Sequence, residues 1–184
     1  LPHRNRPPRP PRLPENGAAR RDAHRCRAGT TVLGALADPA VVERYQSKII
    51  TVPGNSCRWW SGSISGRGHG RFWVGAGRVV IAHRFAFALE YGLDALAHAQ
   101  VLGHRCDNPL CQRIDPQHVV VSSAGENRRE WAIRRALAGS PVGDPRGSRE
   151  RAQVMRDLLR RDPQLVADEL LRLRIRHGEQ LALW

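Results

Sequence analysis

The spacing of apolar residues divides the first half of the chain into segments of different expected structure. Residues 38–48 predict a short helix, because Asp38 suits an N-cap and Pro39 suits the first helical position. Between residues 57 and 74, bulky and small side chains alternate with frequent Gly and Ser, which is typical of strands joined by tight turns. Residues 77–92 pass from a β-branched run into a helix that we expect to stop at Gly92.

The second half of the chain alternates irregular and helical segments. Residues 93–122 show no long periodic pattern but contain two cysteines and three histidines, so a bound metal is the expected source of their order. A helix is predicted from residue 123 or 124 to residue 139, followed by a linker over 140–148. From about residue 149 the apolar spacing predicts two amphipathic helices, interrupted near Asp162–Pro163.

These segments predict an α+β protein in three parts. A disordered arm rich in Arg and Pro covers 1–29, a compact domain covers 30–139, and a helical extension covers 140–184. We expect Cys26, in the arm, to have no structural role. The core is expected to contain the aromatic residues of the strand region, which are Trp59, Trp60, Phe72 and Trp73.

Basic residues dominate the charge of the chain. Its 184 residues include 30 Lys and Arg against 17 Asp and Glu, which gives a net charge of +13. This favours a polyanionic partner, because each cation that meets a phosphate releases counterions. Since codon bias also produces arginine-rich chains, the charge indicates a nucleic-acid partner without identifying a site.

The sequence predicts a cytoplasmic protein with no membrane partner. No stretch approaches the roughly 20 apolar residues of a membrane span. Residues 1–12 also lack the apolar core of a signal peptide. In a reducing compartment, four cysteines indicate metal ligands before disulfides.

Cys106, Cys111 and His118 form a candidate zinc site. The turn-forming residues 107–109 let both thiolates face one ion, and three cysteines with one histidine form a regular structural zinc set. Cys57 is the expected fourth ligand. The competitors for that place are Cys26, His98 and His104. Without a metal, the three residues would be buried thiols and a surface imidazole.

The segment from Val101 to Asn127 resembles the core of the HNH (His-Me finger) nucleases, and among them the His-Cys box homing endonucleases. The matching positions are His104, Cys106, Cys111, His118 and Asn127, with Cys57 as the upstream ligand. The resemblance covers about 75 residues, from Cys57 to Trp131. It implies a small zinc-braced ββα-metal fold with flanking helices. It also implies that the protein cleaves DNA and leaves 5′-phosphate and 3′-hydroxyl ends.

The chain departs from the family pattern at several points. The spacing between Cys111 and His118 is longer than usual, and Asp115 stands where Asn commonly precedes the proline. Gly103 stands where many HNH enzymes carry an acidic metal ligand. The second zinc site of the His-Cys box enzymes has no counterpart here.

The resemblance assigns roles to three residues. His104 would be the general base, with a zinc ligand or a surface histidine as alternatives. Asn127 would bind a catalytic Mg²⁺, or else stabilise its own helix turn. Arg71 would contact the scissile phosphate, unless it is only a solvated arginine. Three further expectations each concern a pair of residues. His83 and Arg84 would orient their helix, Arg128 and Arg129 would face DNA, and Arg134 and Arg135 would be solvated.

The sequence therefore predicts a metal-dependent DNA endonuclease with structural Zn²⁺ and catalytic Mg²⁺. The alternatives are a non-catalytic zinc-stabilised DNA-binding module and, less well supported, an RNA-binding protein. A homodimer through residues 149–184 is a further expectation, because cutting both strands in one encounter needs two centres. Its apolar face would include Leu158, Leu170, Leu171 and Leu173, unless these leucines fold back on their own core.

Overall fold

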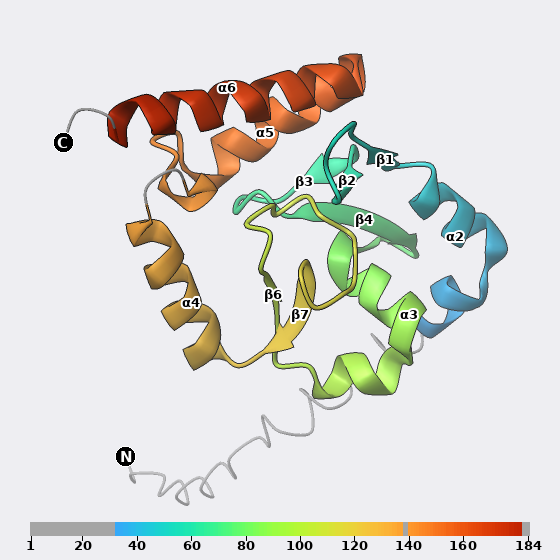
Figure 1. Ribbon diagram of the computed structural model, residues 1–184. Helices are drawn as coiled ribbons and strands as arrows, with labels where there is room; N and C mark the ends of the chain where they lie inside the picture. Colours follow the sequence, from blue (N-terminus) through green and yellow to red (C-terminus); the bar gives the residue numbers. More distant parts are fainter. Residues whose placement is uncertain (1–31, 138–139, 182–184) are drawn as a thin grey trace, which may run out of the picture.

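The structure is a computed structural model that describes residues 32–137 and 140–181 (Figure 1). The predictions for the arm over 1–29 and for Cys26 lie outside these residues. The described chain is a mixed α/β fold with three small antiparallel sheets. No helix in this part of the chain is both long enough and apolar enough to span a membrane.

The first two sheets form largely where the sequence predicted strands, but β1 precedes the predicted region. Strand β1 (Ile49–Thr51) pairs with β2 (Arg58–Trp60), and β4 (Gly70–Gly75) lies between β3 (Ser63–Ile64) and β5 (Arg78–Ile81). Helix α2 (Pro39–Gln46) precedes them, and the side chain of Asp38 accepts a hydrogen bond from the backbone N–H of Ala40. The predicted N-cap is therefore confirmed.

Helix α3 (Ala82–His98) follows β5 and differs from the prediction beyond Gly92. This glycine has φ of 84°, which L residues rarely adopt, and its backbone is not helical. The predicted stop at Gly92 is therefore confirmed, but a second helical segment that the sequence did not predict follows it up to His98. The α3 residues before Gly92 pack on the β3–β4–β5 sheet, with Phe85 and Ala82 fully buried.

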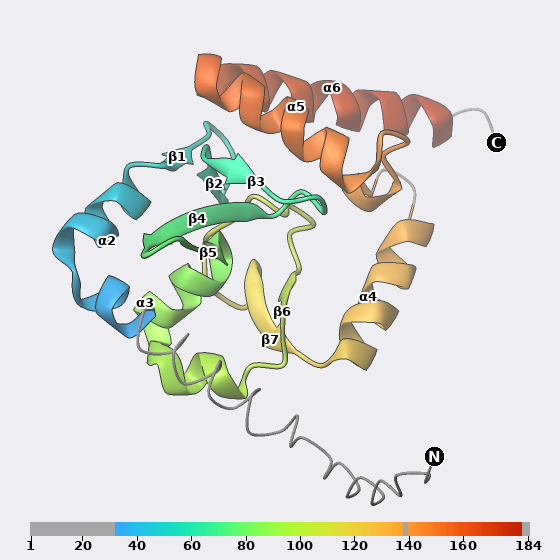
Figure 2. The same cartoon turned by 180° about the vertical axis from the view of Figure 1, so that it is seen from behind.

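The segment with the cysteines forms a hairpin followed by a helix. Strand β6 (Val101–His104) pairs with β7 (Val119–Ser122), and His104 is opposite Val119. Helix α4 (Ala124–Ala136) begins directly afterwards, capped by the side chain of Ser123. It ends three residues before the predicted end, and residues 138–139 are not described. Figures 1 and 2 show α4 beside the hairpin from both sides.

The C-terminal part folds back on the rest of the molecule. After a short 3-10 helix, η1 (Pro141–Gly143), helices α5 (Gly147–Arg161) and α6 (Pro163–Leu181) form an antiparallel pair above the sheets (Figure 2). The predicted interruption at Asp162–Pro163 is confirmed. Met155 and Leu159 are buried in the main core.

The leucines proposed for a dimer interface have mixed environments. Leu158, Leu170 and Leu173 pack against the main core, whereas Leu171 keeps 59% of its surface exposed. Most of the apolar face therefore covers the molecule's own core. Dimerisation stays a prediction, to be tested by light scattering of the full chain at micromolar concentration.

The main core joins α2, the sheets and α3 through stacked aromatic rings. Tyr45 contacts Trp60, Phe72 and Phe85, with ring centroids 5.0 to 5.4 Å apart. The prediction for Trp59, Trp60 and Phe72 is confirmed, since each is at most 2% exposed.

The core prediction for Trp73 is wrong. Side chains alternate across β4, so Trp73 points away from the face that buries Phe72. Its ring is 52% exposed and lies under the guanidinium of Arg44, 5.0 Å away.

Candidate functional site

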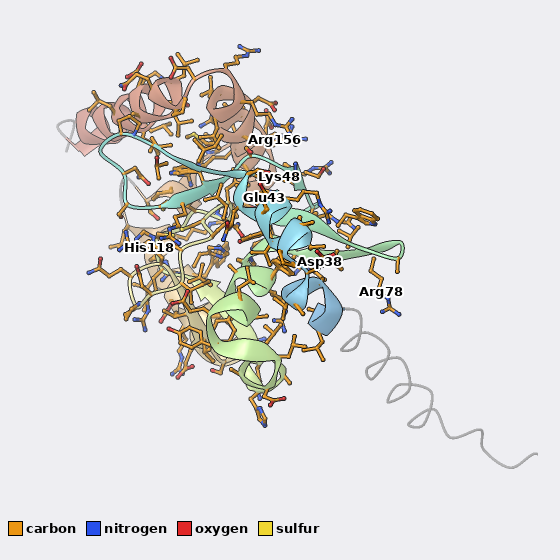
Figure 3. The ribbon with its side chains drawn as sticks, turned by 90° about the vertical axis from the view of Figure 1, so that its right-hand side faces the viewer. Asp38, Glu43, Lys48, Arg78, His118 and Arg156 are labelled. Atoms are coloured by element: carbon orange, nitrogen blue, oxygen red, sulfur yellow. The ribbon has the colours of Figure 1, made fainter. Side chains whose placement is uncertain are left out.

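The predicted zinc ligands converge on one point. The donor atoms of Cys57, Cys106, Cys111 and His118 all lie within 4.8 Å of one another. Cys57 directly precedes β2, and Cys111 forms an isolated bridge with Trp59 of that strand. His118 directly precedes β7 and is labelled in Figure 3, away from Asp38 and Glu43 of the α2 region. Thus β2 and the β6–β7 loop together position all four side chains.

The spacing of these atoms fits a tetrahedral zinc ion. Zn–S bonds of about 2.3 Å and Zn–N bonds of about 2.0–2.1 Å place S and N about 3.6 Å apart in a tetrahedron. The Nδ1 atom of His118 lies 3.6 Å from Cys57 Sγ and 3.5 Å from Cys111 Sγ. The cluster can therefore bind a metal such as zinc.

The electrostatics of the thiols also favour a bound cation. Contacts with Cys106 and then Cys111 lower the pKa of the Cys57 thiol to about 4. The side chains of Cys106 and Cys57, together with burial, raise the pKa of Cys111. The thiolate of Cys57 is thus stable on its own, but ionising the neighbouring thiols as well would place like charges close together. A divalent cation between them removes that repulsion.

Hydrogen bonds around the cluster orient its ligands. The second ring nitrogen of His118, Nε2, lies 3.1 Å from Ser56 Oγ, and the N–H of Arg113 donates to Cys111 Sγ over 3.5 Å. Such contacts fix the tautomer of a ligand histidine and stabilise a thiolate.

His104 lies at the end of β6, two residues before the ligand Cys106. Its Nε2 is 3.3 Å from the carbonyl oxygen of Cys111. A carbonyl can only accept, so Nε2 carries the hydrogen and Nδ1 keeps a free lone pair. Burial lowers the pKa of His104 to about 4, so its ring is neutral at neutral pH. Cys111, one of the four clustered residues, thus supplies the carbonyl that orients the His104 ring.

His104 and Asn127 border one cavity, although they lie 23 positions apart in the sequence. This cavity has a volume of about 880 Å³, and its wall combines β6, α4, the β3–β4 loop and residues 141–148. Asn127 Oδ1 lies 2.8 Å from the point where a Cβ on Gly103 would sit. The absence of a side chain at Gly103 therefore leaves room for this amide.

Arg71 is not part of the cavity wall, whereas Arg67 is. Arg71 lies on the exposed side of β4 and pairs with Ser63 and Ile81. Arg67 belongs to the β3–β4 loop, which carries it over the cavity.

Sequence reasoning did not predict that His69 and His83 contact His104. His83 packs edge-on against its ring at 4.6 Å, and His69 lies 5.5 Å away between ring centroids. His83 is buried, and no hydrogen bond in the described structure involves its Nδ1. Burial holds the pKa values of both rings below the usual range. No spacing rule could have found this cluster, because its members come from three separate elements.

The β3–β4 loop owes its position to a glycine. Gly68 has φ of 85°, and a Cβ there would lie 2.8 Å from the Ser148 carbonyl oxygen. Only glycine permits both the backbone conformation and this close approach to α5. Arg67 and His69 are thereby held at the cavity.

The prediction that Arg134 is merely solvated is wrong. Its Nε lies 2.7 Å from Asp107 Oδ1, and this ion pair connects α4 to the loop that contains Cys106 and Cys111. Asp107 also has a positive φ of 54°, a conformation that Asp tolerates better than most residues. The prediction for Arg128, Arg129 and Arg135 is not tested by these contacts.

Comparison with known proteins adds one partial similarity. The chain is 32% identical to protein 7.7 of Escherichia phage T7 over 78 residues, which are 42% of this chain and 56% of the phage protein. The matched part thus spans little more than half of that relative, whose name states no activity. No protein-family model matches this chain. No solved structure matches it either.

Proposed function

We propose that this protein is a metal-dependent DNA endonuclease built on a zinc-braced ββα-metal fold. The two strands would be β6 and β7, and the helix would be α4. The observation that carries the proposal is the shared cavity, which is lined both by a neutral imidazole with a free Nδ1 and by the amide of Asn127. A base beside a hard oxygen ligand is the arrangement that phosphodiester hydrolysis needs.

His104 would act as the general base. Its Nδ1 would accept a proton from water as that water attacks the phosphorus, while Nε2–H keeps its hydrogen bond to the Cys111 carbonyl. The neutral state that burial enforces is the one that a base requires before reaction. The zinc cluster would have no part in the reaction beyond fixing this geometry.

Asn127 is the candidate ligand for Mg²⁺. An amide oxygen is a hard donor, and Mg²⁺ accepts few protein ligands because it retains several waters. The ion would neutralise charge on the scissile phosphate and on the departing oxygen. Among the arginines, Arg67 in the cavity wall is better positioned than Arg71 to contact the phosphate.

The surface of α4 supports a DNA partner. This helix has no buried residue, and Arg128, Arg129 and Arg135 lie along it. Together with the net charge of +13, an exposed basic helix beside the cavity favours phosphate contacts. A DNA-binding module without catalysis would explain the charge and the zinc cluster, but it would give the cavity no role.

A cleavage assay tests the proposed activity. Zinc-loaded protein incubated with supercoiled plasmid should produce nicked or linear DNA when Mg²⁺ is added, and none when Mg²⁺ is omitted. Omission is preferable to a chelator, which would also remove zinc. Binding without cleavage at any Mg²⁺ concentration would favour the non-catalytic alternative.

Substitution of Gly103 tests the geometry of the cavity. Gly103→Ala should reduce cleavage at least about tenfold, because the new Cβ forces Asn127 away from its position and small displacements of a reacting group are costly. Zinc content should not change. Gly66→Ala is a matched control, since no atom lies within 4 Å of its Cβ position. Equal activity of both variants would remove Asn127 from the proposed site.

A further inference from the structure

One face of α4 carries three cavity residues in a row. Asn127, Trp131 and Arg135 are four residues apart, so they share a face of the helix, and all three line the cavity. At 1.5 Å per residue, each step is about 6 Å along the helix axis. This is close to the spacing of successive nucleotides in an extended strand.

Trp131 has the environment of a stacking platform. Its side chain keeps 45% of its surface exposed, and the guanidinium of Arg135 lies 5.0 Å from the ring centroid. Neither Arg135 nor Arg67 forms an ion pair within the described residues, so both remain available to phosphates. A half-exposed indole beside cations that have no carboxylate partner is typical of sites that bind single strands.

A second part of the cavity wall lies beside the end of α4, where η1 contacts that helix. It includes Pro141, Asp144 and Ser148, and Arg151 donates from Nη1 to the Pro141 carbonyl over 2.9 Å. Arg146 pairs with Asp144 in the same segment at 2.7 Å. A cavity of about 880 Å³ has the size of a small-ligand site, so it can hold a few nucleotides.

We propose that this cavity binds DNA whose strand is unpaired next to the scissile phosphate, with a base stacked on Trp131. In a duplex, both faces of each base are covered by neighbours, so an indole can stack only on a base that has left the helix. The phosphate beyond that base would meet Arg135. This inference rests on the proposed nuclease function and specifies its substrate class.

Binding measurements test the inference without cleavage. Fluorescein-labelled oligothymidine and a labelled DNA hairpin of equal nucleotide number, whose stem is closed by a polyethylene glycol linker so that it has no unpaired base, would be titrated with wild-type protein in Mg²⁺-free buffer at fixed salt. Trp131→Ala should weaken oligothymidine binding about tenfold and leave hairpin binding unchanged, because only the unpaired strand uses the indole. Trp131→Phe should restore most of the affinity.

Trp73→Ala is the matched control, since Trp73 is also exposed and also lies under an arginine, but outside the cavity. It should bind both probes as the wild type does. Equal losses in the two variants, or a loss for the hairpin as large as for oligothymidine, would overturn the inference. Oligouridine bound as tightly as oligothymidine would overturn its restriction to DNA.

A cleavage comparison separates this inference from the proposed function. With Mg²⁺, DNA carrying a single-stranded flap or gap should be cut at least tenfold faster than the matching full duplex. If the protein cuts no DNA, and Trp131→Ala still weakens oligothymidine binding, the nuclease proposal fails and the stacking site stands. If it cuts full duplex as fast as gapped DNA, the substrate inference fails and the nuclease proposal stands.

Discussion

Replacing His104 by alanine is expected to lower the rate of DNA cleavage by at least about 100-fold, the lower end of what general bases contribute. The free Nδ1 lone pair is the only feature of this side chain that the proposed reaction uses, and alanine removes it. Zinc content, the thermal unfolding midpoint and DNA binding should stay near wild-type values, because His104 does not belong to the metal cluster. Single-turnover cleavage with saturating Mg²⁺ measures the effect.

His98→Ala is the control for the loss of a histidine. His98 is exposed at the end of α3, and its Nδ1 contacts only the Asp94 carbonyl of the same helix, at 2.7 Å. This variant should cleave DNA at the wild-type rate. Undiminished nicking by a zinc-replete His104→Ala protein would exclude His104 as the base and would leave the cavity without a catalytic role.

Cys111→Ser is expected to destabilise the fold more than any other substitution considered for this chain. Structural zinc sites contribute about 10–16 kcal/mol in small peptides, which is comparable to the whole stability of an ordinary domain. The same residue bridges to Trp59 and supplies the carbonyl that orients His104. A fall in Tm of more than about 10 °C should follow, since each kcal/mol changes Tm by about 2–4 °C at this chain length.

Metal analysis and calorimetry check this prediction. The wild type should contain about one zinc per chain, because the four side chains complete one tetrahedron, and the variant should contain almost none. Cys26→Ser is the cysteine control, which should retain both zinc and Tm if Cys26 has no structural role. Wild-type protein that contains no zinc as purified, together with a Cys111→Ser variant that unfolds at the wild-type temperature, would show that no zinc site exists.

The sequence alone determined the features that depend on neighbouring residues. Asp38 caps α2, the chain breaks at Asp162–Pro163, and the Cys106–Cys111–His118 set meets Cys57. Caps and breaks follow from the backbone chemistry of a few adjacent residues. The metal cluster could be predicted because soft ligands this close together have few other uses in a turn-rich segment.

Only the tertiary structure decided which distant side chains share a site. Alternation in β4 puts Phe72 and Trp73 on opposite faces, but the helices α2 and α3 decide which face is buried. The contacts of His69 and His83 with His104, and the cavity wall that α4 shares with residues 141–148, join elements that no local spacing relates. Such contacts depend on how whole helices and strands pack together. The packing is fixed by burial of their common hydrophobic core, and no single segment of the sequence determines it.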